Sequence, residues 1–112
     1  MSLSQKQREF SRHIGDLIHQ IYARGYAFSF GHAYRCPDCP VGKKNSLHKS
    51  RLAVDVNLFK DGEYLEDPEE HRQFAQYWEA LHPDNRSGIR FNDANHYERV
   101  PEPWRDGTED SI

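Results

Sequence analysis

Four residues have the types and spacing to hold and use a zinc ion: His48, Asp55, Asp93 and His96. A catalytic zinc site takes three ligands from His, Asp or Glu, keeps a fourth position open for water, and needs a nearby carboxylate to move protons. His48 precedes Asp55 by seven residues, so a loop could fold the imidazole back over the strand that carries the carboxylate. His96 would add a third ligand, distant in sequence but adjacent in a sheet.

Asp93 precedes His96 by three residues, a spacing that places two side chains on opposite faces of a regular strand. Residues 92–95, Asn-Asp-Ala-Asn, have the composition of a turn or bulge, which removes this objection. With the backbone bent there, His96 can bind the metal while Asp93 faces the bound water. We therefore predict that Asp93 serves as a general base.

The first elements that must position these residues are a helix and a strand. Residues 4–24 predict an amphipathic helix, because Ser4 with Gln7 resembles a capping box and Gly25 stands where a helix would stop. Its apolar residues recur at helical spacing: Phe10, Ile14, Leu17, Ile18 and Ile21. The alternation in Tyr26–Phe30 predicts a strand with one buried face. Residues 31–46 lack periodicity and predict a long loop.

The middle of the chain predicts the strand that carries Asp55. Alternation over Leu52–Phe59 places the even-numbered apolar residues on one face and Asp55 on the other. Asp61-Gly62 is a tight-turn signal before a short returning strand at Tyr64-Leu65. Asp67 as N-cap and Pro68 as the first helical residue then open a second helix. Its apolar stripe is Phe74, Tyr77, Trp78 and Leu81.

The last third predicts another strand that a turn interrupts. His82–Gly88 is rich in structure-breaking residues, Ile89–Phe91 suggests a strand, and His96–Val100 would continue it after the turn. Residues 101–112 form a polar tail. These patterns predict an α+β fold in one domain, residues 1–112, with a small antiparallel sheet, two helices on one face and the zinc cleft on the other.

Composition excludes several classes of partner. The 112 residues carry a formal net charge of −3, and the Lys and Arg residues are scattered, so we expect no nucleic-acid partner. No apolar run approaches the roughly 20 residues that span a bilayer, so we expect no membrane insertion. Residues 1–10 are too polar for a secretory signal, which predicts synthesis in the cytoplasm. We expect a monomer.

Two blocks of sequence carry the four candidate residues. Residues 46–59, SLHKSRLAVDVNLF, contain a motif similar to S-x-H-x-x-G-x-A-x-D, and residues 91–98, FNDANHYE, place an acid three residues before a histidine. Both blocks resemble those of the D-alanyl-D-alanine carboxypeptidase and L-alanyl-D-glutamate endopeptidase family of zinc peptidases. The resemblance covers Tyr26 to Glu98, and bacteriophage endolysins of this family are similar in length.

The resemblance implies a site and a substrate. It implies Zn²⁺ on His48, Asp55 and His96, the base Asp93, and Arg35 as the residue that anchors a substrate carboxylate or steadies the oxyanion. One position departs from the pattern, because Arg51 stands where the family has glycine. The implied partner is a peptidoglycan stem peptide, which requires release of the protein to the cell wall by another factor.

Within the family, an endolysin-type L-alanyl-D-glutamate endopeptidase is favoured over a D-alanyl-D-alanine carboxypeptidase, because the short chain and the acid at Asp93 resemble phage enzymes. An alternative of another class is a zinc-holding binding or phage structural module without catalysis. A module that only binds has no need of a carboxylate beside the metal. Asp93 therefore favours an enzyme.

Several residues keep two interpretations. A single histidine is usually packed or solvated, so His48 and His96 gain meaning only together with Asp55 and Asp93. Cys36 and Cys39 could be half of a second metal site, perhaps with His32, a local disulfide, or part of a structural loop. Glu98 could support the ligand His96 or be a solvated strand residue.

Overall fold

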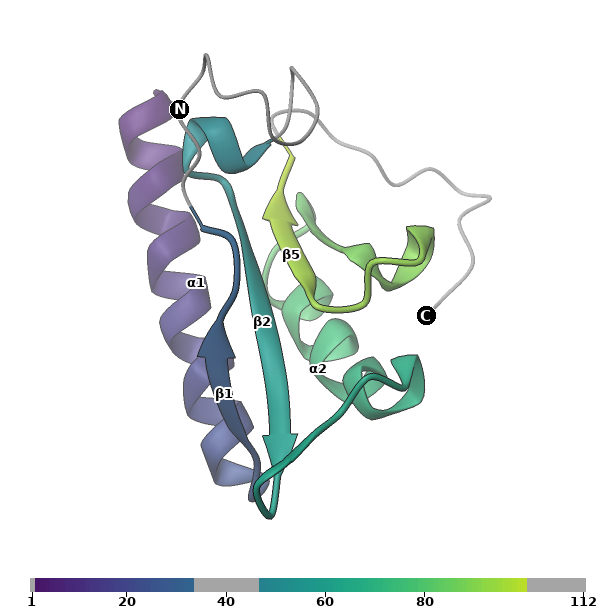
Figure 1. The fold of residues 1–112 in the computed structure, drawn as a ribbon. Helices are drawn as coiled ribbons and strands as arrows, with labels where there is room; N and C mark the ends of the chain where they lie inside the picture. Colours follow the sequence, from purple (N-terminus) through teal and green to yellow (C-terminus); the bar gives the residue numbers. More distant parts are fainter. Residues whose placement is uncertain (1, 34–46, 101–112) are drawn as a thin grey trace.

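The computed structural model of the chain describes residues 2–33 and 47–100. In these ranges it shows two α-helices, two short 3-10 helices and an antiparallel sheet (Figure 1). The elements are α1 (Leu3–Ala23), β1 (Ala27–Phe30), η1 (Leu47–Ser50), β2 (Ala53–Lys60), β3 (Glu63–Tyr64), α2 (Pro68–Leu81), β4 (Asn85–Ser87), η2 (Gly88–Phe91) and β5 (His96–Arg99). The small α+β fold predicted from the sequence is confirmed.

The sheet places the long strand β2 at its centre. Strands lie in the order β1-β2-β5-β4, and β3 pairs with the end of β2. All neighbouring strands are antiparallel. The register sets Asp55 of β2 directly opposite His96 of β5. Two residues that lie 41 positions apart in the sequence are therefore cross-strand neighbours.

Both α-helices pack on one face of this sheet (Figure 1). The even-numbered apolar residues of β2 join the buried stripes of α1 and α2 in a single core, and Tyr97 of β5 completes it. The core residues are Phe10, Ile14, Leu17, Ile21, Leu52, Val54, Val56, Leu58, Phe74, Trp78 and Tyr97. Because side chains alternate along a strand, Asp55 projects from the opposite face.

The two helices begin and end for identifiable reasons. The capping box of α1 is formed by Ser2 and Gln5, whose backbone and side-chain groups bond reciprocally. The prediction of Ser4 with Gln7 was wrong, because the same Ser-x-x-Gln pattern occurs two residues earlier and lets the helix start sooner. Gly25, with a φ of 86°, lies just beyond the end as predicted. No helix in residues 2–33 and 47–100 has the length and apolar character to cross a membrane.

The predicted start of α2 is confirmed. Asp67 is its N-cap and accepts a hydrogen bond from the backbone of Glu69, and Pro68 is the first helical residue. Phe74 and Trp78 are fully buried. Strand β2 also lies within one residue of its predicted limits. By contrast, Phe30 on β1 is 52% exposed, so only part of the expected buried face of that strand is covered.

The prediction for residues 82–91 was wrong. Ile89–Phe91 belongs to η2 and not to a strand, whereas the strand β4 is formed by Asn85–Ser87. The strand has no apolar alternation, because its buried side chains Asn85 and Ser87 are polar. Asn85 donates a hydrogen bond to the carbonyl of Trp78, and the backbone N–H of Ser87 donates to Glu79. Polar contacts with α2 replace the hydrophobic pattern on which the prediction depended.

Candidate metal centre

His48 is held over the polar face of the sheet by η1. Its Nδ1 lies 2.7 Å from the carbonyl oxygen of Ala33, and the ring is buried. Gln7 on α1 donates to the Ser50 carbonyl at 2.9 Å and fixes the end of η1. Because the Ala33 carbonyl can only accept, Nδ1 carries a proton, and Nε2 faces the site.

The chain leaves η1 through a left-handed residue. Arg51 has a φ of 56°, in the region that favours glycine. This is the position at which the resembled motif has glycine. The turn therefore keeps the backbone conformation that glycine would adopt, although arginine occupies it.

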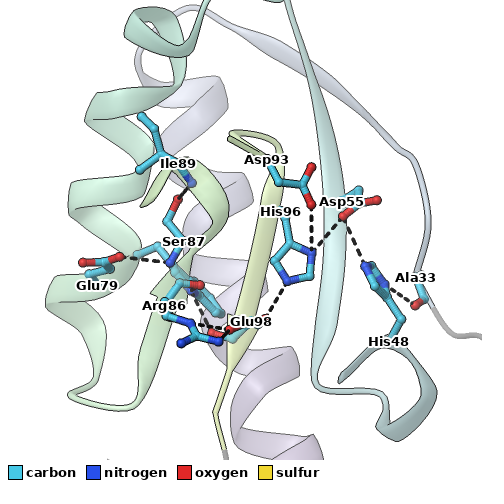
Figure 2. A network of polar contacts seen from close by, with 11 residues as sticks. Ala33, His48, Asp55, Glu79, Arg86, Ser87, Ile89, Asp93, His96 and Glu98 are labelled. Atoms are coloured by element: carbon cyan, nitrogen blue, oxygen red, sulfur yellow. Dashed lines mark hydrogen bonds and ion pairs between the residues drawn. The ribbon is translucent and has the colours of Figure 1, made fainter. Parts of the chain in front are cut away.

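Asp55 lies between the two histidines (Figure 2). Its Oδ1 is 3.3 Å from His48 Nε2 and 3.2 Å from His96 Nδ1. The backbone N–H of Asp55 donates to the His32 carbonyl at 2.7 Å, which ties β2 to the segment after β1. All three side chains are buried, with residue exposures of 3% for His48, 8% for Asp55 and 7% for His96.

These three residues, which we call the metal cluster, offer one ligand atom each, and the three atoms lie within 4.8 Å of one another. They are the candidate metal-holding group in the described part of the chain. Two imidazole nitrogens and a carboxylate oxygen suit zinc and leave a coordination position open. The donor set therefore fits a divalent metal ion, and zinc is the identity that the resemblance implies.

Asp93 comes from the turn that precedes β5 (Figure 2). Its Oδ2 lies 3.9 Å from His96 Nδ1, and its side chain is 52% exposed, unlike those of the three ligand residues. The predicted turn between η2 and β5 is present, with Asn92 in the left-handed region. Asp93 thus lies on the same side of His96 as the candidate ligand atom, open to solvent.

Gly88 allows this turn to fold back on itself. A Cβ atom at Gly88 would lie 2.1 Å from the carbonyl oxygen of Asp93 and 2.7 Å from the Cβ of His96. The backbone N–H of Asp93 donates to the Gly88 carbonyl at 2.8 Å, and that of His96 donates to the Asp93 carbonyl at 2.9 Å. A larger residue would displace both Asp93 and His96. The role of Gly88 was not predicted from the sequence, where this glycine is one structure-breaking residue among several.

Glu98 lies two residues beyond His96, and it is buried. Its Oε1 is 2.7 Å from His96 Nε2, the nitrogen that faces away from Asp55 (Figure 2). The interpretation as a solvated strand residue is therefore wrong, and the interpretation as a partner of His96 is confirmed. Arg86 contacts the other oxygen of Glu98 through two nitrogens. Arg86 was not singled out from the sequence, because no motif marks it.

The electrostatics of the cluster follow from its mixture of burial and pairing. Burial alone would raise the pKa of Asp55, but hydrogen bonds from His48 and His96 outweigh it and hold that pKa well below its usual range. Burial opposes protonation of His96, yet Asp55 and Glu98 together raise its pKa to about 9. The carboxylates of Asp55 and Glu98 are therefore ionised at neutral pH. When no metal ion is bound, protonated His96 supplies the positive charge that balances them.

Three further predicted residues lie outside the described ranges: Arg35, Cys36 and Cys39. The role of Arg35 as a substrate-binding residue stays a prediction. His32, the suggested companion of the cysteines, is described. Its ring is exposed and its centroid lies 6.3 Å from that of His48.

The chain matches no protein-family model and no curated protein. The geometry of the metal cluster and the two motifs are therefore the features that indicate a function.

Proposed function

We propose that this protein is a zinc-dependent peptidase that cuts stem peptides of bacterial peptidoglycan, most specifically between L-alanine and D-glutamate. His48, Asp55 and His96 would hold the zinc ion, and Asp93 would be the general base. The observation that carries the proposal is the convergence of three buried ligand atoms within 4.8 Å beside one exposed carboxylate. A site that only stores metal has no use for that carboxylate.

The outer contacts of the two histidines support the proposal. Histidines that bind metal usually donate their second N–H to a carbonyl or a carboxylate, which fixes the tautomer and the ring orientation. His48 has the Ala33 carbonyl at 2.7 Å, and His96 has the Glu98 carboxylate at 2.7 Å. In each ring, the nitrogen near Asp55 is therefore the one left to bind. This arrangement suits a ligand set held in advance of metal binding.

Asp93 supports a hydrolytic role for the site. A zinc ion in such a site supplies Lewis acidity, which polarises a carbonyl oxygen and lowers the pKa of water to about 7. Asp93 is close enough to His96 to reach the same reaction centre, and its exposure lets it meet water and substrate. Its carboxylate would accept a proton from the attacking water and return it to the leaving amine.

The cell-wall substrate is supported by the resemblance of residues 46–59 and 91–98 to the peptidase family. The left-handed backbone at Arg51 adds to this support, because glycine, the residue of the family motif at this position, adopts that conformation most readily. We propose that Arg35 anchors the substrate carboxylate, since a guanidinium stays charged and offers forked donors.

The direct test is digestion of purified peptidoglycan by zinc-loaded protein, with the new termini identified by mass spectrometry. We expect new carboxyl-terminal L-alanine and amino-terminal D-glutamate. Asp93→Asn should lower the rate by about 10²- to 10⁴-fold, because it removes the base while keeping the shape. Asp16→Asn, on the exposed face of α1, is the matched control and should cut like the wild type.

The other outcomes are equally informative. Release of free D-alanine would mean that the protein is a D-alanyl-D-alanine carboxypeptidase and not an endopeptidase. If the zinc-loaded wild type releases no fragment, the protein is a zinc-holding module and not a hydrolase. If Asp93→Asn cuts as fast as the wild type, the proposed base is wrong.

A further inference from the structure

The two ring nitrogens of His96 have different neighbours, and both neighbours are acidic (Figure 2). Nδ1 lies 3.2 Å from Asp55 Oδ1, whereas Nε2 lies 2.7 Å from Glu98 Oε1. Only one of these nitrogens can bind a metal ion shared with His48 and Asp55, because His48 Nε2 converges on the same carboxylate oxygen. The nitrogen of His96 that keeps its proton when an ion binds therefore decides whether the metal cluster can hold that ion.

Glu98 is fixed by Arg86 and cannot turn freely. Arg86 and Glu98 are direct cross-strand partners on β4 and β5. Two nitrogens of Arg86, Nε and Nη2, each lie 2.5 Å from Glu98 Oε2. One carboxylate oxygen is thus occupied by the guanidinium, and the other is left for His96.

The backbones of this pair are fixed as well. The indole N–H of Trp78 is shared between the carbonyl oxygens of Arg86, at 3.3 Å, and Glu98, at 3.1 Å. Trp78 is fully buried in the core between the helices and the sheet. The core therefore sets the positions of Arg86 and Glu98, and through them the orientation of the His96 ring.

We propose that Glu98, held by Arg86, is the positioning residue of the metal centre: it accepts the Nε2 proton of His96 so that bare Nδ1 is presented to the metal ion. Neither residue contacts the metal in this role. The proposal rests on the zinc binding proposed above, but not on hydrolysis, so absence of peptidase activity would leave it standing.

The pairing predicts an unusual effect of the isosteric variant Glu98→Gln. Its single carbonyl oxygen would accept the hydrogen bonds of the charged Arg86 guanidinium, which turns the amide NH2 toward His96 Nε2. Nε2 would then have to accept a hydrogen bond, and the proton would move to Nδ1, where it blocks the metal. We expect zinc affinity to fall by about 10- to 100-fold, the range typical for loss of a ligand's supporting partner.

A second substitution should restore part of the loss. In the double variant Arg86→Met with Glu98→Gln, the guanidinium that would bind the amide oxygen is gone. The amide introduced by Glu98→Gln can then turn its oxygen toward His96 and accept a hydrogen bond from the Nε2 proton. We expect this double variant to bind zinc several-fold more tightly than Glu98→Gln alone. A purely structural role for Glu98 predicts the opposite order, because the double variant disrupts more of the β4–β5 contact.

The experiment is a zinc competition titration with a chromophoric chelator at one fixed pH, together with ¹⁵N NMR of the His96 ring in zinc-loaded wild type. The control is Glu79→Gln, which weakens a second buried Glu–Arg pair, between Glu79 and Arg90, without touching a candidate ligand. It should lower thermal stability and leave zinc affinity unchanged. The NMR spectrum should show zinc on Nδ1 and a proton on Nε2.

Besides the opposite order of the single and double variants, two results would overturn the proposal. One is a Glu98→Gln variant whose zinc affinity falls no further than that of Glu79→Gln. The other is zinc on Nε2 of His96 in the wild type, a reading that remains decisive even if Glu98→Gln does not fold.

Discussion

Two parts of the described chain bring a pair of histidines to a carboxylate, but they arrange them differently. In the metal cluster the rings of His48 and His96 lie 5.0 Å apart, and both converge on one oxygen of Asp55. A second group, which we call the distal cluster, lies where α1 meets the loop before β4 and the end of β5. Its members are Glu9, His13, His82, Asp84 and Arg99. The rings of His13 and His82 lie 5.8 Å apart.

The difference is a buried arginine. In the distal cluster, Arg99 Nη1 contacts the same oxygen of Glu9 that lies 3.5 Å from His82, and the Arg99 hydrogen bond lowers the pKa of Glu9. Glu9 therefore already has a permanent cation. Among the described residues the charged partners of Asp55 are His48 and His96, so its balancing charge there comes from their protons or from a metal ion. Similar residue types thus make an ion pair in one place and a candidate metal centre in the other.

The metal cluster and the distal cluster should differ most in their response to zinc. Zinc should stabilise the wild type by about 4 kcal/mol when the free ion is about 1,000-fold above Kd, because it binds the folded state alone. Asp55→Asn should lose most of this gain, since the variant lacks the anionic ligand. The measurement is chemical unfolding with zinc and with a chelator.

His82→Asn is the matched control for this zinc effect, because it removes a histidine from the distal cluster. Its stability should rise with zinc as much as that of the wild type. An equal loss of the zinc effect in both variants would mean that the ion binds without regard to the metal cluster, and the contrast between the two groups would disappear.

The distal cluster should respond to loss of its arginine. Arg99 has a side chain that is 4% exposed and joins β5 to α1 through Glu9. Arg99→Met should lower the free energy of unfolding by about 2 kcal/mol, because it leaves Glu9 with histidine as its remaining partner in the pair. The stabilisation by zinc should stay unchanged, which denaturant titrations with and without the ion can measure.

An exposed pair provides the comparison for Arg99. Arg72 and Glu69 form an i,i+3 ion pair on α2, with exposed side chains. Arg72→Met should cause no measurable change, since solvent screens such pairs. A loss of stability as large as that of Arg99→Met would show that burial is not the source of the Arg99 effect.

The sequence predicted the parts of the fold that depend on apolar periodicity and on caps. The stripes of α1 and α2, the N-cap at Asp67 and the alternation along β2 were all interpreted correctly. Strand β4 could not be predicted, because Asn85 and Ser87 are buried by polar contacts with α2 and leave no hydrophobic pattern. Periodicity records burial of apolar groups and is silent where hydrogen bonds stabilise a strand.

The residues of the candidate site were likewise predicted in part and missed in part. His48, Asp55 and His96 were predicted together, because ligand chemistry restricts residue types and the motifs fix their spacing. Gly88 was missed, because its role depends on a close approach to Asp93 and His96 that only the folded chain creates. Arg86 was missed for a related reason: an arginine is meaningful there only through its cross-strand partner Glu98. No local pattern in one strand records the identity of the other.

The pH dependence of zinc binding contrasts the pKa of His96 with that of His13. Asp55 and Glu98 raise the pKa of His96 to about 9, after burial has opposed them. Burial lowers the pKa of His13, although Glu9 partly offsets this. Below about pH 9, zinc must displace a proton from His96, so its affinity should rise about tenfold for each pH unit, or about 1.4 kcal/mol.

The pH at which zinc affinity stops rising shows whether the proton that zinc displaces comes from His96, whose pKa is raised, and not from His13. Asp55 and Glu98 have lowered pKa values and are already ionised, so they add no slope near neutral pH. If His96 is the ligand that loses a proton, chelator competition should show affinity still rising above pH 8, and His13→Asn should reproduce the wild-type curve. A plateau near pH 6.5, the range of an ordinary histidine, would mean that the acids around His96 do not hold its proton. Asp55 and Glu98 would then not set the metal cluster apart from the distal cluster, where the positive charge beside Glu9 is that of Arg99 and does not depend on pH in this range.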